Sequence, residues 1–307
     1  MVNSAEQGGV VLHHAIQSSM AGNGVSVLVI PGDVSMQDAE DDSFVESKIS
    51  AGRPVVFPDP AEAAALTQAI NEAKSVTLFV GAGVKDAREQ VLKLAEKIKA
   101  PIGHALGGKM YIQYENPFDV GMNGLLGYGA AHEATHEADL LILLGTDFPY
   151  NDFLPDANVA QVDINGSHIG RRTKISYPVT GDVAATIENI LPHVDEKKDR
   201  SFLDKMLKKH YGKLEHVVEA YTSNVDKHTP IHPEYVADLI DKNADEDAIF
   251  TVDTGMCNVW GARYITANGK REQIGSFRHG TMANALPQAL GAQAANPGRQ
   301  VITFSGD

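Results

Sequence analysis

Short apolar runs alternate with helical segments through the middle of this 307-residue chain. The run at residues 140–144 is apolar at every position, which is typical of a strand buried on both faces. Between such runs apolar side chains recur at helical spacing, as at Val91, Leu94 and Ile98. This order predicts an α/β fold with a doubly wound parallel sheet. The expected strands are 76–80, 101–105, 140–144, 159–164 and a stretch at Val179, and the expected helices are 58–73, 86–99, 133–138 and 183–190.

The flanks of this central region predict parts of two further α/β domains. At the N-terminal end we expect a helix over 10–20 and a buried strand over 25–30, followed by a polar linker. At the C-terminal end a charged connecting segment precedes helices over 233–242 and 283–295 and strands over 248–253 and 301–304. The last strand leads into Gly306-Asp307, so we expect that domain to be incomplete. The expected division is 1–35, 36–57, 58–194, 195–228 and 229–307.

Charge and composition exclude several classes of function. The formal net charge is −14 and no Lys/Arg cluster is present, which argues against a nucleic-acid partner. The single cysteine, Cys257, excludes a disulfide framework within the chain and fits a reducing compartment. We expect it to be a small packed residue rather than a nucleophile. The N-terminus does not read as a signal peptide, and no apolar run is long enough to predict a membrane span.

A glycine turn follows the first expected strand of the central region. Gly81 and Gly83 lie between this strand and a helix, where backbone N–H groups can approach a ligand phosphate. The full dinucleotide fingerprint needs a third glycine, and Asp86 stands in its place. A tight turn without a ligand is therefore an equal alternative.

Three other segments add candidate ligand-binding residues. Residues 121–129 are dense in glycine, and the loops at 145–150 and 163–165 each follow an expected strand. Ligands of doubly wound sheets bind outside the carboxyl ends of the strands, so these loops predict one shared crevice. Asp163 either binds ribose hydroxyl groups there or caps a turn.

Two histidine-containing motifs have competing interpretations. His132-Glu133-Ala134-Thr135-His136 matches the H-E-x-x-H pattern of zinc hydrolases, but no third ligand follows at the spacing of zinc proteases. The alternative is a polar helix surface. Near the C-terminal end, a Gly-Thr turn precedes a helix rich in small residues, whose positive end can bind an anionic or polar ligand. The adjacent His279 is more typical of a hydrogen-bonded structural residue than of a catalyst.

Four stretches, 116–122, 144–150, 181–183 and 274–287, carry a family resemblance. Together they resemble the thiamine-diphosphate-dependent enzymes that include pyruvate oxidase, acetolactate synthase and pyruvate dehydrogenase (quinone), and the last of these is the most similar. The resemblance covers essentially the whole chain. It implies that 1–35 is the tail of a pyrimidine-binding domain, 58–194 a central FAD-binding domain, and 229–307 the start of a diphosphate-binding domain.

The resemblance also implies cofactor contacts. For thiamine diphosphate, the Gly280 carbonyl would accept from the 4′-amino group, Thr281 would lie beside it, and Met282 would support the bent cofactor. Asp307 would bind Mg²⁺, a hard cation that prefers oxygen ligands. FAD would be bound by Gly81, Gly83, Leu125, Leu126, Gly127, Tyr128, Phe148, Pro149, Tyr150, Asn151, Asp152, Asp163, Ile164, Asn165, Gly166 and Asp182.

The implied reaction is the oxidative decarboxylation of pyruvate to acetate and CO₂, with electrons passing through FAD to a membrane quinone. The resemblance further implies a homotetramer in the cytoplasm, associated peripherally with the inner face of the cell membrane. The family's activating glutamate and its second magnesium ligand have no counterpart in this sequence, so we expect no catalytic residue within it and no turnover by this chain alone. The alternatives are an acetolactate-synthase-like carboligase with non-redox FAD, a nucleotide-binding module and the zinc hydrolase.

Overall fold

The computed structural model describes residues 1–22, 24–38, 48–50, 52, 54–156, 158–217, 219–223 and 225–306. The chain divides into two compact units, Met1–Val55 and Val56–Asp307. Within the described ranges, no helix combines the length and the apolar character that a bilayer crossing requires.

The first unit is built around one long helix. Helix α1 (Gly8–Gly22) contains the predicted helix, and a short helix α2 (Gly32–Ser35) follows it. The predicted strand over 25–30 is wrong, because these residues are extended without forming a strand. Val25 is 94% exposed and Val27 is 80% exposed. A strand exists only where a neighbour supplies ladder hydrogen bonds, and the described residues of this unit supply no ladder for this segment.

The second unit contains a seven-stranded sheet with the order β4-β3-β2-β1-β5-β6-β7. All neighbouring strands are parallel except β4, which pairs with β3 in antiparallel orientation. The predicted α/β fold with a parallel sheet is confirmed, while the hairpin of β3 and β4 was not predicted. The strands are β1 (Val76–Val80), β2 (Ile102–His104), β3 (Asp119–Met122), β4 (Tyr128–Gly129), β5 (Leu140–Leu144), β6 (Val159–Asp163) and β7 (Tyr177–Thr180).

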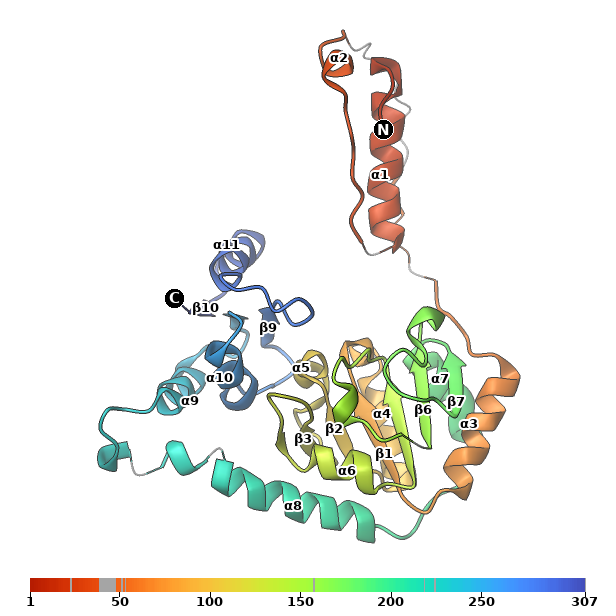
Figure 1. The fold of residues 1–307 in the computed structure, drawn as a ribbon, viewed down its shortest axis with the longest axis vertical. Coiled ribbons are helices and arrows are strands. Elements are labelled where there is room, and N and C mark those ends of the chain that lie inside the picture. The colour runs from red at the N-terminus through yellow and green to blue at the C-terminus, as the bar shows by residue number, and fades with distance from the viewer. Residues whose placement is uncertain are drawn as a thin grey trace. The chain divides into compact units, whose positions relative to one another are not determined.

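Helices cover both faces of this sheet (Figure 1). One face carries α3 (Pro60–Glu72), α4 (Arg88–Ile98) and α7 (Val183–Ile190), and the other carries α6 (Ala131–Glu137). Helix α8 (Ser201–Val217) contacts α6 and the strands β3 and β4. Side chains alternate along each strand, so that Leu78 joins the first core and Phe79 joins a second one on the opposite face. Burial of each such side chain contributes roughly 1.5–3 kcal/mol.

Local sequence signals explain where the covering helices begin and end. The predicted cap of α3 is confirmed, because the Asp59 carboxylate accepts from the backbone N–H groups of Ala61 and Glu62. In α4 the predicted apolar stripe is buried, and Lys99 ends the helix in the left-handed conformation. These helices fix the sheet and thereby fix the loops at its carboxyl edge.

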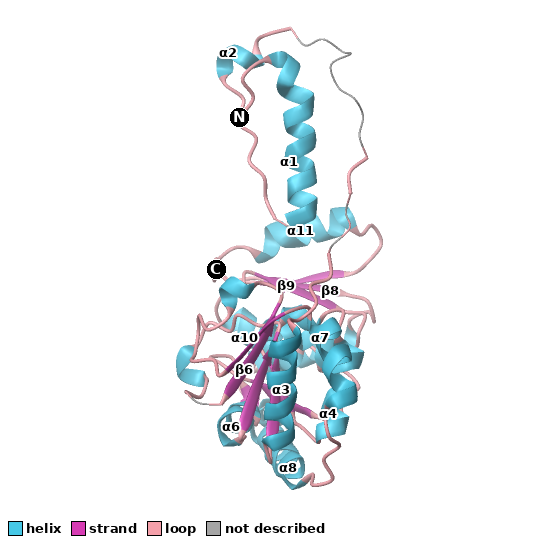
Figure 2. Ribbon diagram, turned by 90° about the vertical axis from the view of Figure 1, so that its right-hand side faces the viewer, coloured by secondary structure: helices cyan, strands magenta, loops and turns pink. Residues whose placement is uncertain are grey.

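A second parallel sheet of three strands, with the order β10-β8-β9, forms the C-terminal part of this unit. Helix α11 lies against this sheet and contacts all three strands (Figure 2). Helix α10 contacts β8 and β10 and is backed by α9. The elements are α9 (Pro233–Asn243), β8 (Ile249–Val252), α10 (Met256–Tyr264), β9 (Glu272–Gly275), α11 (Ala285–Ala295) and β10 (Val301–Phe304).

Two cationic side chains join the seven-stranded part to the three-stranded part. Lys109, at the start of α5 (Lys109–Ile112), is 1% exposed and donates to the carbonyls of Gly261 and Ile265 at the end of α10. Arg263 of α10 donates in the opposite direction, to the Gly127 carbonyl at 3.1 Å. Burial lowers the pKa of Lys109 to about 7. We call these contacts the two-cation seam.

Candidate functional site

The loops that follow β1 and β5 touch each other at the carboxyl edge of the large sheet. The Gly83 N–H donates to the Gly145 carbonyl at 2.9 Å, and the Gly81 N–H donates to the Leu144 carbonyl at 3.1 Å. A Cβ atom on Gly83 would lie 2.6 Å from the Gly145 Cα. The close contact between the loops is therefore sufficient to require glycine at position 83, without any ligand. A phosphate contact at Gly81 and Gly83 stays a prediction.

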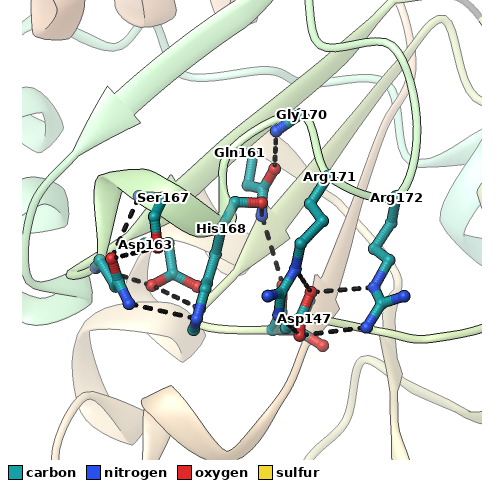
Figure 3. A network of polar contacts seen from close by, with 10 residues as sticks. Asp147, Gln161, Asp163, Ser167, His168, Gly170, Arg171 and Arg172 are labelled. Carbon is teal, nitrogen blue, oxygen red and sulfur yellow. Dashed lines mark hydrogen bonds and ion pairs between the residues drawn. The ribbon is translucent and has the colours of Figure 1, made fainter.

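A carboxylate clamped by two arginines lies beside these loops (Figure 3). The Arg171 Nε donates to Asp147 Oδ1 at 3.1 Å, and the Arg172 Nε donates to the same oxygen at 3.0 Å. Burial alone would raise the pKa of Asp147, but the hydrogen bonds from both guanidinium groups outweigh it and hold the pKa below its usual value. Sequence reasoning included the Asp147 loop but missed both arginines, which lie more than twenty residues away.

The end of β6 forms the neighbouring part of this network (Figure 3). The Asp163 side chain is 8% exposed, and its carboxylate accepts from the Asn165 N–H at 2.8 Å, with His168 Nδ1 at 3.6 Å from it. Asn165 in turn caps a short helical turn by accepting from the Ser167 N–H. Asp163 thus holds its own loop in shape, and Ile164 and Gly166 lie exposed on the same turn.

The loop after β5 continues into a series of aromatic rings. Phe148 is 4% exposed and makes edge-to-face contacts with Phe79 at 5.0 Å and with Tyr150 at 5.4 Å between ring centroids. Tyr150 then contacts Phe153. Phe148 is therefore a core residue, whereas the other predicted FAD-lining residues of this loop are exposed: Pro149, Tyr150, Asn151 and Asp152.

The β3–β4 hairpin forms the edge of the large sheet opposite β7. It carries the predicted residues Leu125, Leu126, Gly127 and Tyr128. Leu125 is 67% exposed, while Leu126 packs against a buried cluster that includes Tyr128. The Tyr128 hydroxyl accepts from the Gln113 amide at 2.5 Å, and burial raises the pKa of this tyrosine. This segment therefore forms a strand pairing rather than an open glycine loop.

Two further predicted features have local partners in the structure. Asp182 caps α7, since its carboxylate accepts from the Ala185 N–H at 3.0 Å. In the H-E-x-x-H segment, the His132 and His136 rings lie 4.2 Å apart on α6, but Glu133 forms an ion pair with Lys213 of α8. The described part of the chain contains no group of three or more His, Cys, Asp or Glu side chains placed to hold a metal ion.

The predicted thiamine corner is a turn held by side chains. The Thr281 carbonyl accepts from the Thr254 hydroxyl at 2.9 Å and from the Asn284 amide at 2.6 Å. Gly280 has φ +63°, a left-handed conformation that favours glycine. Met282 is 67% exposed at the tip of this turn. The corner thus presents an apolar side chain on a fixed backbone.

Asp253, which sequence reasoning passed over, connects this corner to the end of the last strand. Asp253 is 4% exposed, and its carboxylate accepts from the N–H groups of Ala285 at 2.8 Å and Gly306 at 3.0 Å. The bond from Ala285 is the main reason that the pKa of Asp253 lies below its usual value. The predicted magnesium ligand Asp307 lies outside the described residues. A polar residue directly after a buried strand was the available signal for Asp253.

Sequence profiles of known families match both parts of the second unit. "Thiamine pyrophosphate enzyme, central domain" matches residues 63–190, and "Thiamine pyrophosphate enzyme, C-terminal TPP binding domain" matches residues 253–307.

Individual relatives are similar over most or all of the chain. An uncharacterized 42.6 kDa protein of Pseudomonas amyloderamosa is 43% identical over 214 residues, covering 69% of this chain and 54% of the relative. The acetolactate synthase large subunit IlvB1 of Mycobacterium tuberculosis is 30% identical over 329 residues, covering 100% of this chain and 51% of the relative. The chain spans about half the length of these curated relatives.

A solved structure shares the fold. It is that of a protein from Mycobacterium smegmatis that is provisionally described as a thiamin diphosphate-dependent enzyme. The superposition has a TM-score of 0.73 at 20% identity and covers 100% of this chain and 58% of that one.

Proposed function

Because the chain belongs to the thiamine-pyrophosphate-dependent enzymes, we propose that it supplies cofactor-binding parts of an enzyme that decarboxylates a 2-oxo acid such as pyruvate. One observation supports this proposal most directly. The carboxyl ends of β8, β9 and β10 bring Asp253, the corner at Gly280–Met282 and Gly306 to one edge of the small sheet. Parallel sheets bind ligands at this edge.

The chain's own residues fit thiamine diphosphate at this corner. Thr254 and Asn284 fix the Thr281 carbonyl, so that Gly280 and Met282 would meet the cofactor without rearranging. Asp253 holds the amino end of α11 and the turn at Gly306, next to the predicted magnesium ligand. When bound, thiamine diphosphate supplies the carbanion and the electron sink for loss of CO₂.

The large sheet would hold the adenosine and diphosphate portions of FAD. Its carboxyl edge presents the exposed Ile164 and Asn165, and the guanidinium groups of Arg171 and Arg172 lie close by. Positive charge and backbone N–H groups suit a diphosphate. Asp163 would either accept from ribose or keep this loop in shape.

A carboligase of the acetolactate synthase type is the first candidate for the overall reaction. Relatives with this name include the large subunit from Mycobacterium tuberculosis and isozyme 1 of Escherichia coli, which is 29% identical over 245 residues. The quinone-reducing pyruvate dehydrogenase is the second candidate. It is supported by the resemblance of two short sequences, Arg278-His279-Gly280 and Asp147-Phe148-Pro149-Tyr150, to that enzyme. The peripheral membrane location and the homotetramer are proposed only together with this second candidate.

Product analysis separates the two reactions. The enzyme to which this chain would contribute its cofactor-binding parts is incubated with pyruvate, thiamine diphosphate, Mg²⁺ and FAD, and acetolactate is measured in parallel with pyruvate-dependent ferricyanide reduction. Acetolactate without ferricyanide reduction supports the carboligase, and acetate with ferricyanide reduction supports the dehydrogenase. If thiamine diphosphate neither binds nor alters any reaction of pyruvate, the proposal is wrong.

Cofactor binding tests the FAD site on the chain itself. Titration of the chain into FAD should quench flavin fluorescence, and Asp163→Ala should weaken the binding. Asp156→Ala is the matched control, because Asp156 is an exposed carboxylate outside the loop after β6. Equal affinities of all three proteins would remove Asp163 from the site.

A further inference from the structure

A buried pair of ionisable side chains joins the strands β2 and β3 of the large sheet. His104 is the last residue of β2 and is 0% exposed, and Asp119 is the first residue of β3, with a side chain that is 12% exposed. His104 Nε2 lies 3.7 Å from Asp119 Oδ1. None of the cofactor contacts proposed above uses either side chain.

The hydrogen bonds around this pair determine which of its atoms carry hydrogens. His104 Nδ1 lies 3.2 Å from the Ala105 carbonyl, and because a carbonyl oxygen can only accept, Nδ1 carries a hydrogen. His104 Nε2 is buried without a hydrogen-bond partner among the described residues. Asp119 Oδ1, which faces it, accepts from the Gly121 N–H at 3.1 Å. A neutral imidazole and an ionised carboxylate would therefore turn two acceptors toward each other, and one added proton would turn this contact into a hydrogen bond.

The charges around the pair favour its protonated form. Among the residues that the structure describes, no Lys or Arg forms an ion pair with Asp119, and Lys109 instead donates to the carbonyls of Gly261 and Ile265. Burial raises the pKa of the Asp119 carboxyl to about 7 and lowers the pKa of His104 to about 3, which assigns the proton to the carboxyl group. The titratable or charged groups that face the pair or its neighbours are Lys109 of α5, Tyr128 of β4, His210 of α8, Asp241 of α9 and Arg263 of α10.

We propose that His104 and Asp119 share one proton and form a pH-sensitive latch between β2 and β3. With the proton bound, the Asp119 carboxyl O–H donates to His104 Nε2 and closes the latch. When the proton leaves for the solvent, the carboxylate and the bare nitrogen repel each other and the latch opens. Because the β3–β4 hairpin begins at Asp119, the closed latch holds this hairpin more firmly to the sheet.

The direction of the pH dependence follows from the pKa of Asp119, which is higher in the folded than in the unfolded chain. The shared proton therefore stabilises the fold. This stabilisation is complete below about pH 4 and is lost as the pH rises through about 7. Above that pH the latch is open.

Asp119→Asn imitates the closed latch at every pH, because its amide can donate to His104 Nε2 while its oxygen still accepts from the Gly121 N–H. The unfolding equilibrium constants of the full-chain wild type and of this variant are measured by urea denaturation between about pH 5 and about pH 8. The constant of the wild type should rise relative to that of the variant by about tenfold per pH unit up to about pH 7. At the upper end of this range the variant should be the more stable protein. Asp156→Asn, at an exposed carboxylate, should keep a constant ratio to the wild type.

A measurement on the wild type alone locates the shared proton. The ring nitrogens of His104 are followed by ¹⁵N NMR over the same pH range and assigned by their loss in His104→Gln. Nδ1 should stay protonated throughout, while the Nε2 signal should change with one midpoint near the pKa of Asp119, about 7. An Nε2 signal that does not change, or a ratio of unfolding constants that is independent of pH, would overturn the proposal. So would an Asp119→Asn variant less stable than the wild type at the upper end of the range, because Asp119 would then act as the anionic partner of Lys109.

Discussion

Replacing Gly83 by alanine tests whether the contact between the loops after β1 and β5 requires glycine. The new Cβ would lie 2.6 Å from the Gly145 Cα and 2.9 Å from its carbonyl oxygen. Carbon atoms in contact lie about 3.5–4.0 Å apart, so the loops must separate by roughly 1 Å. This movement breaks the 2.9 Å hydrogen bond from the Gly83 N–H to the Gly145 carbonyl.

The expected loss of unfolding free energy follows from these changes. The broken hydrogen bond contributes about 0.5–1.5 kcal/mol and the overpacking about 1–3 kcal/mol. Alanine also restricts the unfolded chain, which offsets about 0.4–1 kcal/mol. We expect Gly83→Ala to lower the unfolding free energy by about 2 kcal/mol in urea denaturation.

Gly107→Ala is the matched control on the adjacent turn. Its Cβ would meet no atom closer than the Ala82 Cβ at 3.5 Å, an ordinary contact. We expect this variant to be neutral or more stable by up to about 1 kcal/mol. If Gly83→Ala and Gly107→Ala denature at the same urea concentration, the loops tolerate separation and the packing argument fails.

Two further predictions concern the C-terminal sheet. Asp253→Ala should lower the unfolding free energy by about 2–4 kcal/mol at pH 7, because the Ala285 N–H loses a charged acceptor. The pKa of Asp253 is lower in the folded than in the unfolded chain, so the difference in unfolding free energy between the wild type and Asp253→Ala should shrink as the pH falls below about 4. Urea titrations at several pH values measure this difference, and a difference independent of pH would contradict the reasoning. Arg271, which is 9% exposed at its side chain, donates to Asp241 Oδ1 at 2.7 Å, so Arg271→Met should cost about 3–5 kcal/mol. Lys270→Met, at an exposed neighbouring position, should change the unfolding free energy by less than about 1 kcal/mol in the same urea titration, and equal effects of the two would refute the assignment.

Apolar patterning predicted the elements that are buried on both sides. The limits of β1, β5 and α7 agree with those expected from the sequence, because the apolar residues of these strands and of this helix face are buried. The limits of β10 agree as well, although its residues are half-buried or exposed. The hairpin of β3 and β4 was not predicted, because its glycines contribute no side chains to the alternation of apolar and polar residues that indicates a strand. Gly121 and Gly129 also adopt positive φ angles of +91° and +76°.

The candidate sites divide in the same way. Strand ends could be located from the sequence, and so could the loops at Gly81, Gly145 and Asp163 that follow them. The sequence did not indicate which side chains meet across these loops. The pairing of Asp147 with Arg171 and Arg172 depends on how β5 and β6 lie beside each other. The predicted strand at 25–30 failed for a related reason, because a single segment does not specify its neighbour.

The two-cation seam has a consequence for how such enzymes can be recombined. Lys109 and the Gly127 carbonyl come from one part, and Arg263 and the Ile265 carbonyl come from the other. Exchanging the seven-stranded part would remove the Lys109 ammonium group from the carbonyls at the end of α10, and exchanging the three-stranded part would remove the Arg263 guanidinium group from the Gly127 carbonyl. Because every acceptor is a backbone carbonyl, a chimera should keep this seam wherever the incoming part supplies the same cation.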